Sequence, residues 1–286
     1  MTDITVIILT KNEELNIARA ITSVKGVADR ICVVDSGSVD KTVEIAKDLG
    51  AEVVVHEFIT HGKQFNWAMR ELNITTTWVF RLDADEEVTK ELGEEIVSKC
   101  ELHKDDDVNA FVGNFKIYFM GRFLKHGGMY PFYRTTIFKT GKGYIDENGM
   151  RDQTVINEGR LEYLKNDFLH YDFKDLQSWI AKHNWYSDLE VKNLTSSMED
   201  ADGTRTDTAD KTIKMRDGLY YRLPKYFRAR LYYWYRYYFK LGFLDGEAGR
   251  VHAFLQAYWY RYLIDAKLFE NEVKTMKNEV KNYDKK

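Results

Sequence analysis

The segment that most constrains the fold runs from Trp78 to Glu87. It begins as a short apolar run typical of a buried strand and ends with four carboxylates within five residues. Because buried charges need partners, we expect the acidic part to leave the sheet at the carboxyl end of the strand. Ligands of open α/β sheets bind at that edge. The segment therefore predicts a strand with a binding site at its C-terminal end.

Asp83 and Asp85 stand two residues apart, so an extended backbone would direct both side chains to the same side. Carboxylate oxygens suit a divalent cation such as Mg²⁺ or Mn²⁺, which could then hold a diphosphate. The alternative interpretation is a solvated acidic loop before the next helix, with Thr89 near its start. Asp-x-Asp pairs are common, so this pair indicates a binding site only in combination with the strand before it and the motifs upstream.

Strands alternate with helices over the first hundred residues. Apolar β-branched runs predict strands, and apolar residues at helical spacing predict helices. The expected strands are 4–10, 30–34 and 52–56, and the expected helices are 15–24 and 41–49. Asn12 could cap the first helix, and Gly50 ends the second. The alternation implies βαβ units around a parallel sheet.

Polar clusters follow two of these strands, at 10–13 and 35–40, and the strand that begins at Trp78, at 83–87. In a doubly wound sheet the three strand ends converge on one crevice. Strand-to-helix loops are polar in general, which accounts for any one cluster but poorly for carboxylates in all three. We therefore expect one shared site.

The composition sets bounds on location and partners. A net charge of −3 carries no nucleic-acid signature, and the two cysteines, Cys32 and Cys100, fit a reducing cytoplasm rather than a disulfide scaffold. Cys32 lies in an apolar strand pattern and is expected in the core. Residues 1–10 carry Asp3 and run straight into a strand, so we expect no signal peptide, and no apolar window is long enough for a spanning helix.

The three polar clusters resemble the signature series of family 2 glycosyltransferases. The residues are Thr10-Lys11-Asn12-Glu13, then Val34 to Thr42, then Asp83-Ala84-Asp85. The resemblance implies a GT-A fold, an α/β architecture with a mixed sheet and a Rossmann-like nucleotide-binding half. It also implies a nucleotide-diphosphate sugar as donor, most simply a UDP-hexose. On this resemblance Asp35 reads the base edge, Asp83 contacts the ribose or a metal water, and Asp85 binds the metal.

Within that family the chain is similar to bacterial enzymes that add sugars to the lipopolysaccharide inner core. These enzymes carry a Gly-x-Gln-x-Asn motif, which is Gly62-Lys63-Gln64-Phe65-Asn66 here. The position before the Asn is usually basic there and is Phe65 here. Lys63 could contact phosphate instead, or could be a solvated lysine. The full set of donor-binding residues that the resemblance implies is Thr10, Asn12, Glu13, Asp35, Ser36, Gly37, Lys63, Gln64 and Asp83.

An inverting transferase needs a carboxylate that accepts a proton from the attacking hydroxyl. Related enzymes have a His-Glu pair where this chain has Arg151-Asp152, so the resemblance implies Asp152 as the base. The neighbouring carboxylates Asp146, Glu147 and Glu158 are alternatives, and Arg151 with Asp152 could be a structural ion pair. His170 matches a His-Tyr of the family, and the resemblance implies that it completes the metal site with Asp85. A lone histidine in the core or at a helix cap is the ordinary alternative.

The C-terminal third has a different character. Residues 193–212 are rich in Ser, Thr, Asp and Gly, which predicts a mobile loop or linker. Residues 220–240 interleave aromatic rings with arginine and lysine and contain no acidic residue. Such helices favour the surface of an anionic membrane. Packing of the rings against the catalytic domain and stacking on single-stranded nucleic acid are alternatives, and the sugar-transfer motifs disfavour nucleic acid.

Together these features predict a metal-dependent, inverting glycosyltransferase that acts on a saccharide or glycolipid acceptor at the inner leaflet. We expect it to be cytoplasmic and peripheral. The expected domains are a catalytic domain at 1–190, with a nucleotide-binding half at 1–100 and an acceptor half at 101–190, a flexible loop at 191–215, and a helical membrane-surface extension at 216–286. The rival functions are a nucleotidyltransferase of sugar phosphates and a non-catalytic, sugar-binding module.

Overall fold

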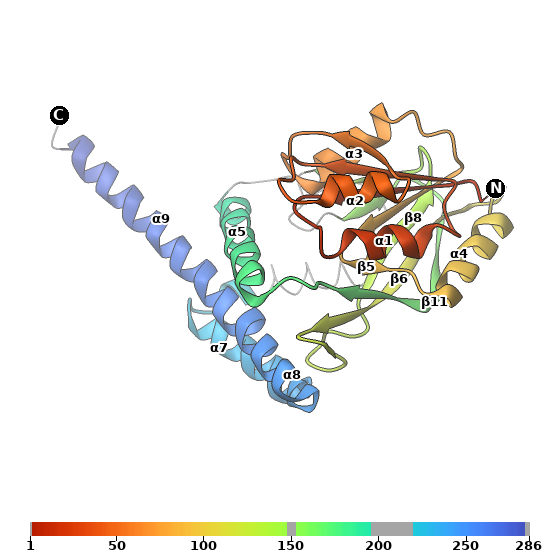
Figure 1. The fold of residues 1–286 in the computed structure, drawn as a ribbon. Helices are drawn as coiled ribbons and strands as arrows, with labels where there is room; N and C mark the ends of the chain where they lie inside the picture. Colours follow the sequence, from red (N-terminus) through yellow and green to blue (C-terminus); the bar gives the residue numbers. More distant parts are fainter. Residues whose placement is uncertain (1, 148–152, 196–219, 284–286) are drawn as a thin grey trace. The chain divides into compact units, whose positions relative to one another are not determined.

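A computed structural model describes residues 2–147, 153–195 and 220–283, and the side chains of residues 278–283 are not described. The chain divides into two compact units (Figure 1). The first contains the residues up to Lys125 together with Met129–Phe173, and the second contains His126–Gly128 and the described residues from Lys174 onward.

The first unit is built on a mixed sheet. Its strands follow the order β3-β2-β1-β4-β8-β6-β11-β5, and β7 pairs with β6. The bounds are β1 Ile4–Thr10, β2 Arg30–Asp35, β3 Glu52–Val55, β4 Trp78–Asp83, β5 Glu86–Glu87, β6 Val108–Phe119, β7 Arg122–Phe123, β8 Tyr133–Lys139 and β11 Arg160–Tyr171. The first four in this order run parallel, and β8 is antiparallel to both β4 and β6. The mixed sheet of a GT-A fold, predicted from the resemblance, is confirmed.

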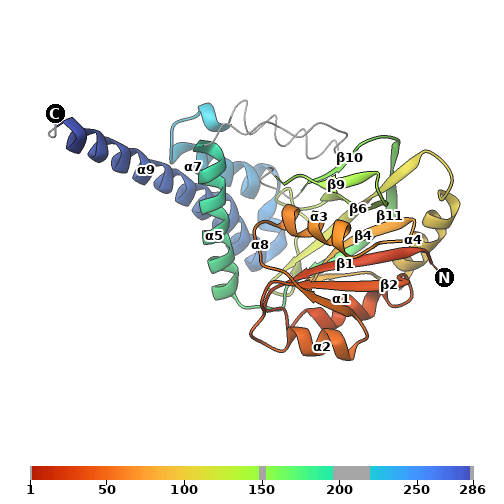
Figure 2. The same cartoon turned by 90° about the horizontal axis from the view of Figure 1, so that it is seen from above.

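Helices cover both faces of this sheet, and Figure 2 shows α3 above it and α1 and α2 below. The bounds are α1 Ile17–Val24, α2 Thr42–Asp48, α3 His61–Glu71 and α4 Lys90–Leu102. The apolar residues of α1, α2 and α4 pack in one core against the even-numbered residues of β1, and α3 packs in a second core on the other face. Because parallel strands are buried on both faces, their sequences read as continuous apolar runs.

One expectation about a helix end is corrected. Helix α1 starts at Ile17 and its N-cap is Asn16, so Asn12 does not cap it. Strand β11 was not expected, because its charged residues interrupt the apolar pattern. Strands β9 Gly143–Ile145 and β10 Thr154–Ile156 form a separate antiparallel pair. Cys32 is in the core as expected, and burial raises the pKa of its thiol to about 11.

The second unit is helical. Its elements are α5 Leu176–Thr195, the 3₁₀ turn η1 Tyr220–Arg222, α7 Phe227–Trp234, the π-helical η2 Tyr235–Phe239, the 3₁₀ turn η3 Gly242–Asp245, α8 Gly246–His252, the π-helical η4 Ala253–Trp259 and α9 Tyr260–Tyr283. The buried carboxylate of Glu190 on α5 accepts hydrogen bonds from Tyr221, Tyr260 and Arg261, and Arg228 on α7 pairs with Asp265 on α9. These buried polar contacts hold the helices together. Among the described helices, none has both the length and the apolar character needed to cross a bilayer.

The first compact unit ends at Phe173, and α5 belongs to the second because it packs with α9. The expected end of the catalytic domain at residue 190 stays a prediction. Residues 193–195 belong to the end of α5, and the remainder of the expected loop at 193–212 lies outside the described residues.

Candidate active site

The three strands that carry the polar clusters end level with one another. In the parallel pairing of β1 with β2, Thr10 is aligned with Asp35. In the pairing of β1 with β4, Leu9 is aligned with Asp83. The carboxyl ends of β2, β1 and β4 therefore form one edge of the sheet, which places the predicted clusters side by side.

The turn after β2 is organised by the carboxylate of Asp35. Its Oδ1 accepts hydrogen bonds from the hydroxyls of Thr10 (3.2 Å) and Ser38, and its Oδ2 accepts from the backbone N–H of Gly37 (2.9 Å) and of Ser38 (2.8 Å). Gly37 has a φ of +79°, which favours glycine. Asp35 is only 1% exposed. The carboxylate shapes this turn, and recognition of a base by Asp35 stays a prediction.

The turn after β1 is bonded to the turn after β2. Asn12 has a φ of +55°, its backbone N–H donates to Ser38 Oγ (2.8 Å), and its Oδ1 accepts from Val39 N (2.9 Å). The backbone N–H of Glu13 donates to Thr42 Oγ1 (2.7 Å). Asn12 therefore braces two loops instead of capping a helix, and the two predicted donor-binding segments form one connected rim.

Asn16 connects this rim to the end of β11, and sequence analysis did not single it out. The side chain is fully buried. Its Nδ2 donates to Glu13 Oε2 (2.8 Å) and to Asp172 Oδ1 (2.9 Å), and its Oδ1 accepts from the backbone N–H of Phe173 (3.0 Å). A buried amide must satisfy its hydrogen bonds. The signal that could have found it is an asparagine directly before a run of core residues.

The motif on α3 is mainly structural. Thr60 caps the helix by accepting from the backbone N–H of Lys63, while the Lys63 side chain is exposed. The buried Gln64 side chain pairs with Ser36 Oγ in the turn after β2. Asn66 pairs with the backbone of Ile145 in both directions, at 2.7 and 2.9 Å. Gln64 and Asn66 thus hold α3 to both the β2 turn and β9.

Asp83 lies in an ion-pair network that sequence analysis missed. Arg134 on β8 donates from Nη1 to Asp83 Oδ2 (2.8 Å) and from Nη2 to both oxygens of Glu86 (2.7 Å). Burial alone would raise the pKa of Asp83, but Arg134 and Arg81 hold it well below its usual range. Burial likewise opposes the charge of Arg134, but the two carboxylates raise its pKa. An arginine within a predicted strand is the signal that could have predicted a buried carboxylate partner.

Asp85 and His170 meet at the same edge. Strand β5 pairs with β11 so that Glu86 is aligned with His170. His170 Nε2 lies 3.6 Å from Asp85 Oδ2, and His170 Nδ1 lies 3.5 Å from Glu86 Oε1. Two of the three predicted metal residues, Asp85 and His170, are therefore neighbours, whereas the carboxylate of the third, Asp83, faces Arg134. Among the described residues, no three or more His, Cys, Asp or Glu side chains are arranged to hold a metal ion by themselves.

The predicted base, Asp152, lies outside the described residues, as does Arg151. The described alternatives each have partners. Glu147 accepts from Asn66 Nδ2 (2.9 Å), Asp146 is buried, and Glu158 is an exposed residue whose pKa is lowered by an ion pair with Lys142. These contacts favour a structural role for Glu147 and Glu158.

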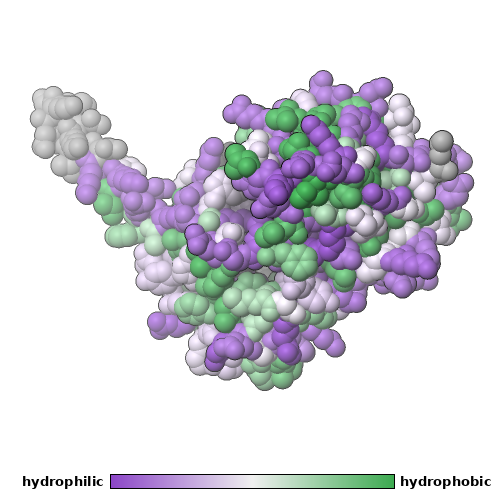
Figure 3. Space-filling model, viewed as in Figure 1, coloured by the Kyte–Doolittle hydropathy of each residue, from purple (hydrophilic) through white to green (hydrophobic). Residues whose placement is uncertain are grey.

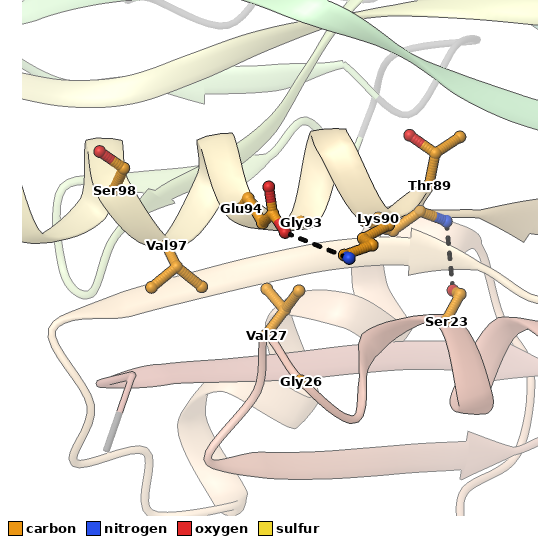
Figure 4. A pocket seen from close by; sticks show the side chains of 10 residues that line it. Ser23, Gly26, Val27, Thr89, Lys90, Gly93, Glu94, Val97 and Ser98 are labelled. Carbon is orange, nitrogen blue, oxygen red and sulfur yellow. Dashed lines mark hydrogen bonds and ion pairs between the residues drawn. The ribbon is translucent and has the colours of Figure 1, made fainter.

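A surface pocket of the first unit lies elsewhere, between the end of α1 and α4 (Figure 4). It contains none of the predicted site residues. In the close-up, Ser23 accepts from the backbone N–H of Val88 (3.1 Å), and Lys90 faces Glu94 at 3.9 Å. The pocket lies where α1 meets the segment that leads into α4, so it is a feature of helix packing.

Comparisons with known proteins point to one family. The model of the family described as "Glycosyl transferase family 2" matches residues 5–158. An uncharacterized glycosyltransferase of Rickettsia felis is 34% identical over 204 residues, which cover 68% of this chain and 71% of that protein. An uncharacterized glycosyltransferase of Rickettsia conorii is 34% identical over 201 residues, which cover 67% of this chain and 70% of that protein.

One solved structure is similar to this chain over almost its whole length. The mannosyltransferase of Pyrobaculum calidifontis, solved in complex with GDP-mannose and Mn²⁺, has a TM-score of 0.51 with 15% sequence identity. The likeness covers 96% of this chain and 87% of that protein. At this identity the comparison supports the fold.

Proposed function

Because the chain belongs to glycosyltransferase family 2, we propose that it moves a hexose from a nucleotide-diphosphate donor, most simply UDP-linked, to a saccharide acceptor. The observation that carries the proposal is the common edge formed by Thr10, Asp35 and Asp83, next to the Asp85–His170 pair. Family membership favours sugar transfer over the nucleotidyltransferase and the non-catalytic module.

The donor would lie along the rim formed by the turns after β1 and β2. Thr10, Asn12, Glu13, Ser36 and Gly37 are all part of this hydrogen-bonded rim. A preorganised rim binds without first ordering its loops. Gln64 would act by holding Ser36 in place, whereas the exposed Lys63 is available to a phosphate.

A divalent cation, Mg²⁺ or Mn²⁺, would be held by Asp85 and His170. A carboxylate oxygen and an imidazole nitrogen that lie 3.6 Å apart fit such an ion. Because two protein ligands are available there, phosphate oxygens and water would complete the coordination, as is usual for Mg²⁺. The solved mannosyltransferase of similar fold holds Mn²⁺ with its donor. When bound, the cation neutralises the diphosphate as it leaves.

Asp83 would serve the donor by a different route. Its carboxylate is paired with Arg134, so it would contact the ribose or a metal-bound water instead of the cation itself. For the chemical step, Asp152 would accept the proton of the acceptor hydroxyl as that hydroxyl attacks the anomeric carbon, which gives inversion.

The acceptor would be a saccharide or glycolipid, such as a lipopolysaccharide core or another surface polysaccharide, presented at the inner leaflet. The aromatic and basic residues of α7 and η2 support this part of the proposal, because such residues favour anionic membrane surfaces. The enzyme would then be cytoplasmic and peripheral at the inner membrane.

The proposal is tested by donor hydrolysis and transfer with a panel of UDP- and GDP-sugars, with Mn²⁺, Mg²⁺ or a chelator. We expect one donor to be cleaved only with a divalent cation. Asp85→Asn should lower the rate by a factor of about 100 or more, since it weakens the site of the cation that would neutralise the leaving diphosphate. Asp152→Asn should lower transfer while leaving donor binding intact.

Asp105→Asn is the matched control, because Asp105 is an exposed aspartate in the acidic turn after α4. Its rate should equal that of the wild type. Full activity of the Asp85 variant would remove the assigned metal site, and full transfer by the Asp152 variant would remove the assigned base.

A further inference from the structure

The outward face of α7 and η2 is apolar, which reverses the usual pattern of a surface helix. Leu231, Trp234 and Tyr238 follow one another at helical spacing and are 42%, 56% and 49% exposed. Arg228 on the same helix is buried and pairs with Asp265 on α9. Surface helices normally bury their apolar stripe and expose their charges. This helix therefore presents rings outward for a reason other than packing within its own unit.

The turn that follows continues the exposed apolar surface. Phe239 is 81% exposed, and Phe243 and Leu244 are also exposed. Ring contacts join the turn to the helix, from Trp234 to Tyr238, from Tyr238 to Tyr237, and from Tyr237 to Phe243. We call Leu231, Trp234, Tyr238, Phe239, Phe243 and Leu244 the aromatic face. Figure 3 shows hydrophobic side chains in the region of α7 and α8.

The backbone under this face is fixed. The buried carboxylate of Asp245 accepts from the backbone N–H of His126 (2.8 Å) and lies 2.7 Å from its ring Nδ1. Gly249 on α8 packs so closely that a Cβ there would lie 2.5 Å from the carbonyl oxygen of Gly242. Phe243 and Leu244 are thus held outward on a rigid turn, and burying them against a partner would cost little ordering entropy.

The charged residues of the same stretch are all basic. From Tyr220 to Leu244 the sequence contains six arginines and lysines and no carboxylate. Arg222, Arg230 and Lys240 of this stretch are exposed, and Lys240 Nζ lies 5.7 Å from the ring centre of Tyr235. Rings with this many cations between them match the interface of a bilayer with anionic lipid, where rings sit at headgroup depth and cations meet phosphate.

We propose that the aromatic face inserts into the headgroup layer of an anionic bilayer, with Phe239, Phe243 and Leu244 deepest and with Arg230 and Lys240 at the phosphates. The inference deepens the membrane part of the proposed function by assigning the contact to one helix and one turn.

Vesicle flotation of the full chain tests the proposal. Vesicles of phosphatidylcholine with phosphatidylglycerol should carry the protein, and vesicles of phosphatidylcholine alone should carry much less. Phe239→Ser/Phe243→Ser should weaken binding by a factor of about 10 or more, because it removes two apolar rings that would move from water into the bilayer. Arg230→Ser/Lys240→Ser should weaken binding about tenfold and reduce its sensitivity to salt.

Phe269→Ser/Met276→Ser is the matched control, since both side chains are exposed at 52% and 54% but lie on α9. Its binding should equal that of the wild type. As a second readout, brominated lipid should quench tryptophan fluorescence, and Trp234→Phe should remove most of that quenching while Trp185→Phe should not.

Failure of the wild type to bind the anionic vesicles, or full binding by the Phe239/Phe243 variant, would overturn the proposal. The proposal would also be overturned if the wild type were an oligomer and the Phe239→Ser/Phe243→Ser variant were a monomer that still binds vesicles. The aromatic face would then bind a second copy of the chain instead of a bilayer. Donor hydrolysis measured without vesicles separates the two proposals, because it tests the catalytic site alone.

Discussion

Arg134 shows most clearly how a single residue sets the chemistry of the site. Its guanidinium is placed between Asp83 and Glu86 and stacks 4.5 Å from the centre of the Phe115 ring. Because Arg134 pairs with these two carboxylates, the proposed cation would lie at Asp85, next to His170. The different roles proposed for Asp83 and Asp85 therefore depend on a residue of another strand.

Arg134→Met should destabilise the fold, since it leaves the buried carboxylate of Glu86 without its arginine and leaves Asp83 paired with Arg81 alone. We expect the free energy of unfolding in urea to fall by about 3 kcal/mol or more. Arg134→Met/Glu86→Gln should recover part of that loss. Arg160→Met, which breaks an exposed ion pair with Asp107, is the control and should change little. An Arg134→Met protein as stable as the wild type would show that the network contributes nothing to stability.

At the residue scale, the sequence predicted which residues lie near one another better than it predicted their hydrogen-bond partners. Asp85 and His170 are neighbours as the resemblance implied, and Thr10 is aligned with Asp35. The hydrogen bonds of Asn12, Asn16 and Gln64 could not be predicted, because each joins loops that are distant in the chain. Their partners become visible only when the strands are paired.

At the scale of elements, strand β11 is the main addition to the predicted fold. Its charged and polar positions break the apolar pattern, yet it runs parallel to β6 near one edge of the sheet and brings His170 beside Asp85. Periodicity works well for β1, β2 and β4, because they are buried on both faces. It fails for β11, since this strand is only partly covered.

Gly113 on β6 makes the close pairing with β11 possible. A Cβ at this position would lie 2.3 Å from a ring carbon of Phe168, which is fully buried and stacks on Phe115. Gly113→Ala should therefore lower the free energy of unfolding by about 1–3 kcal/mol through overpacking. Gly26→Ala is the control, because a Cβ there would meet nothing within 4 Å. Equal stability of the two variants in urea would contradict this account of the β6–β11 contact.

At the scale of the whole molecule, composition and motifs predicted a catalytic α/β part followed by aromatic and basic helices, and both are present. The position of the boundary was less predictable. Helix α5 carries an amphipathic pattern that fits either neighbour, and the buried contacts of Glu190 with Tyr221, Tyr260 and Arg261 assign it to the second unit. Only packing could decide this, because the partners are distant in sequence.

The central claim is that one sheet edge binds a nucleotide diphosphate together with a cation held by Asp85 and His170. Calorimetric titration of UDP into the full chain, with and without Mn²⁺, tests it most directly. The account predicts that Mn²⁺ tightens UDP binding at least about tenfold, and that Asp85→Asn loses this gain while Asp105→Asn keeps it. Equal UDP affinity with and without Mn²⁺, or an Asp85→Asn protein that keeps the full gain, would contradict it.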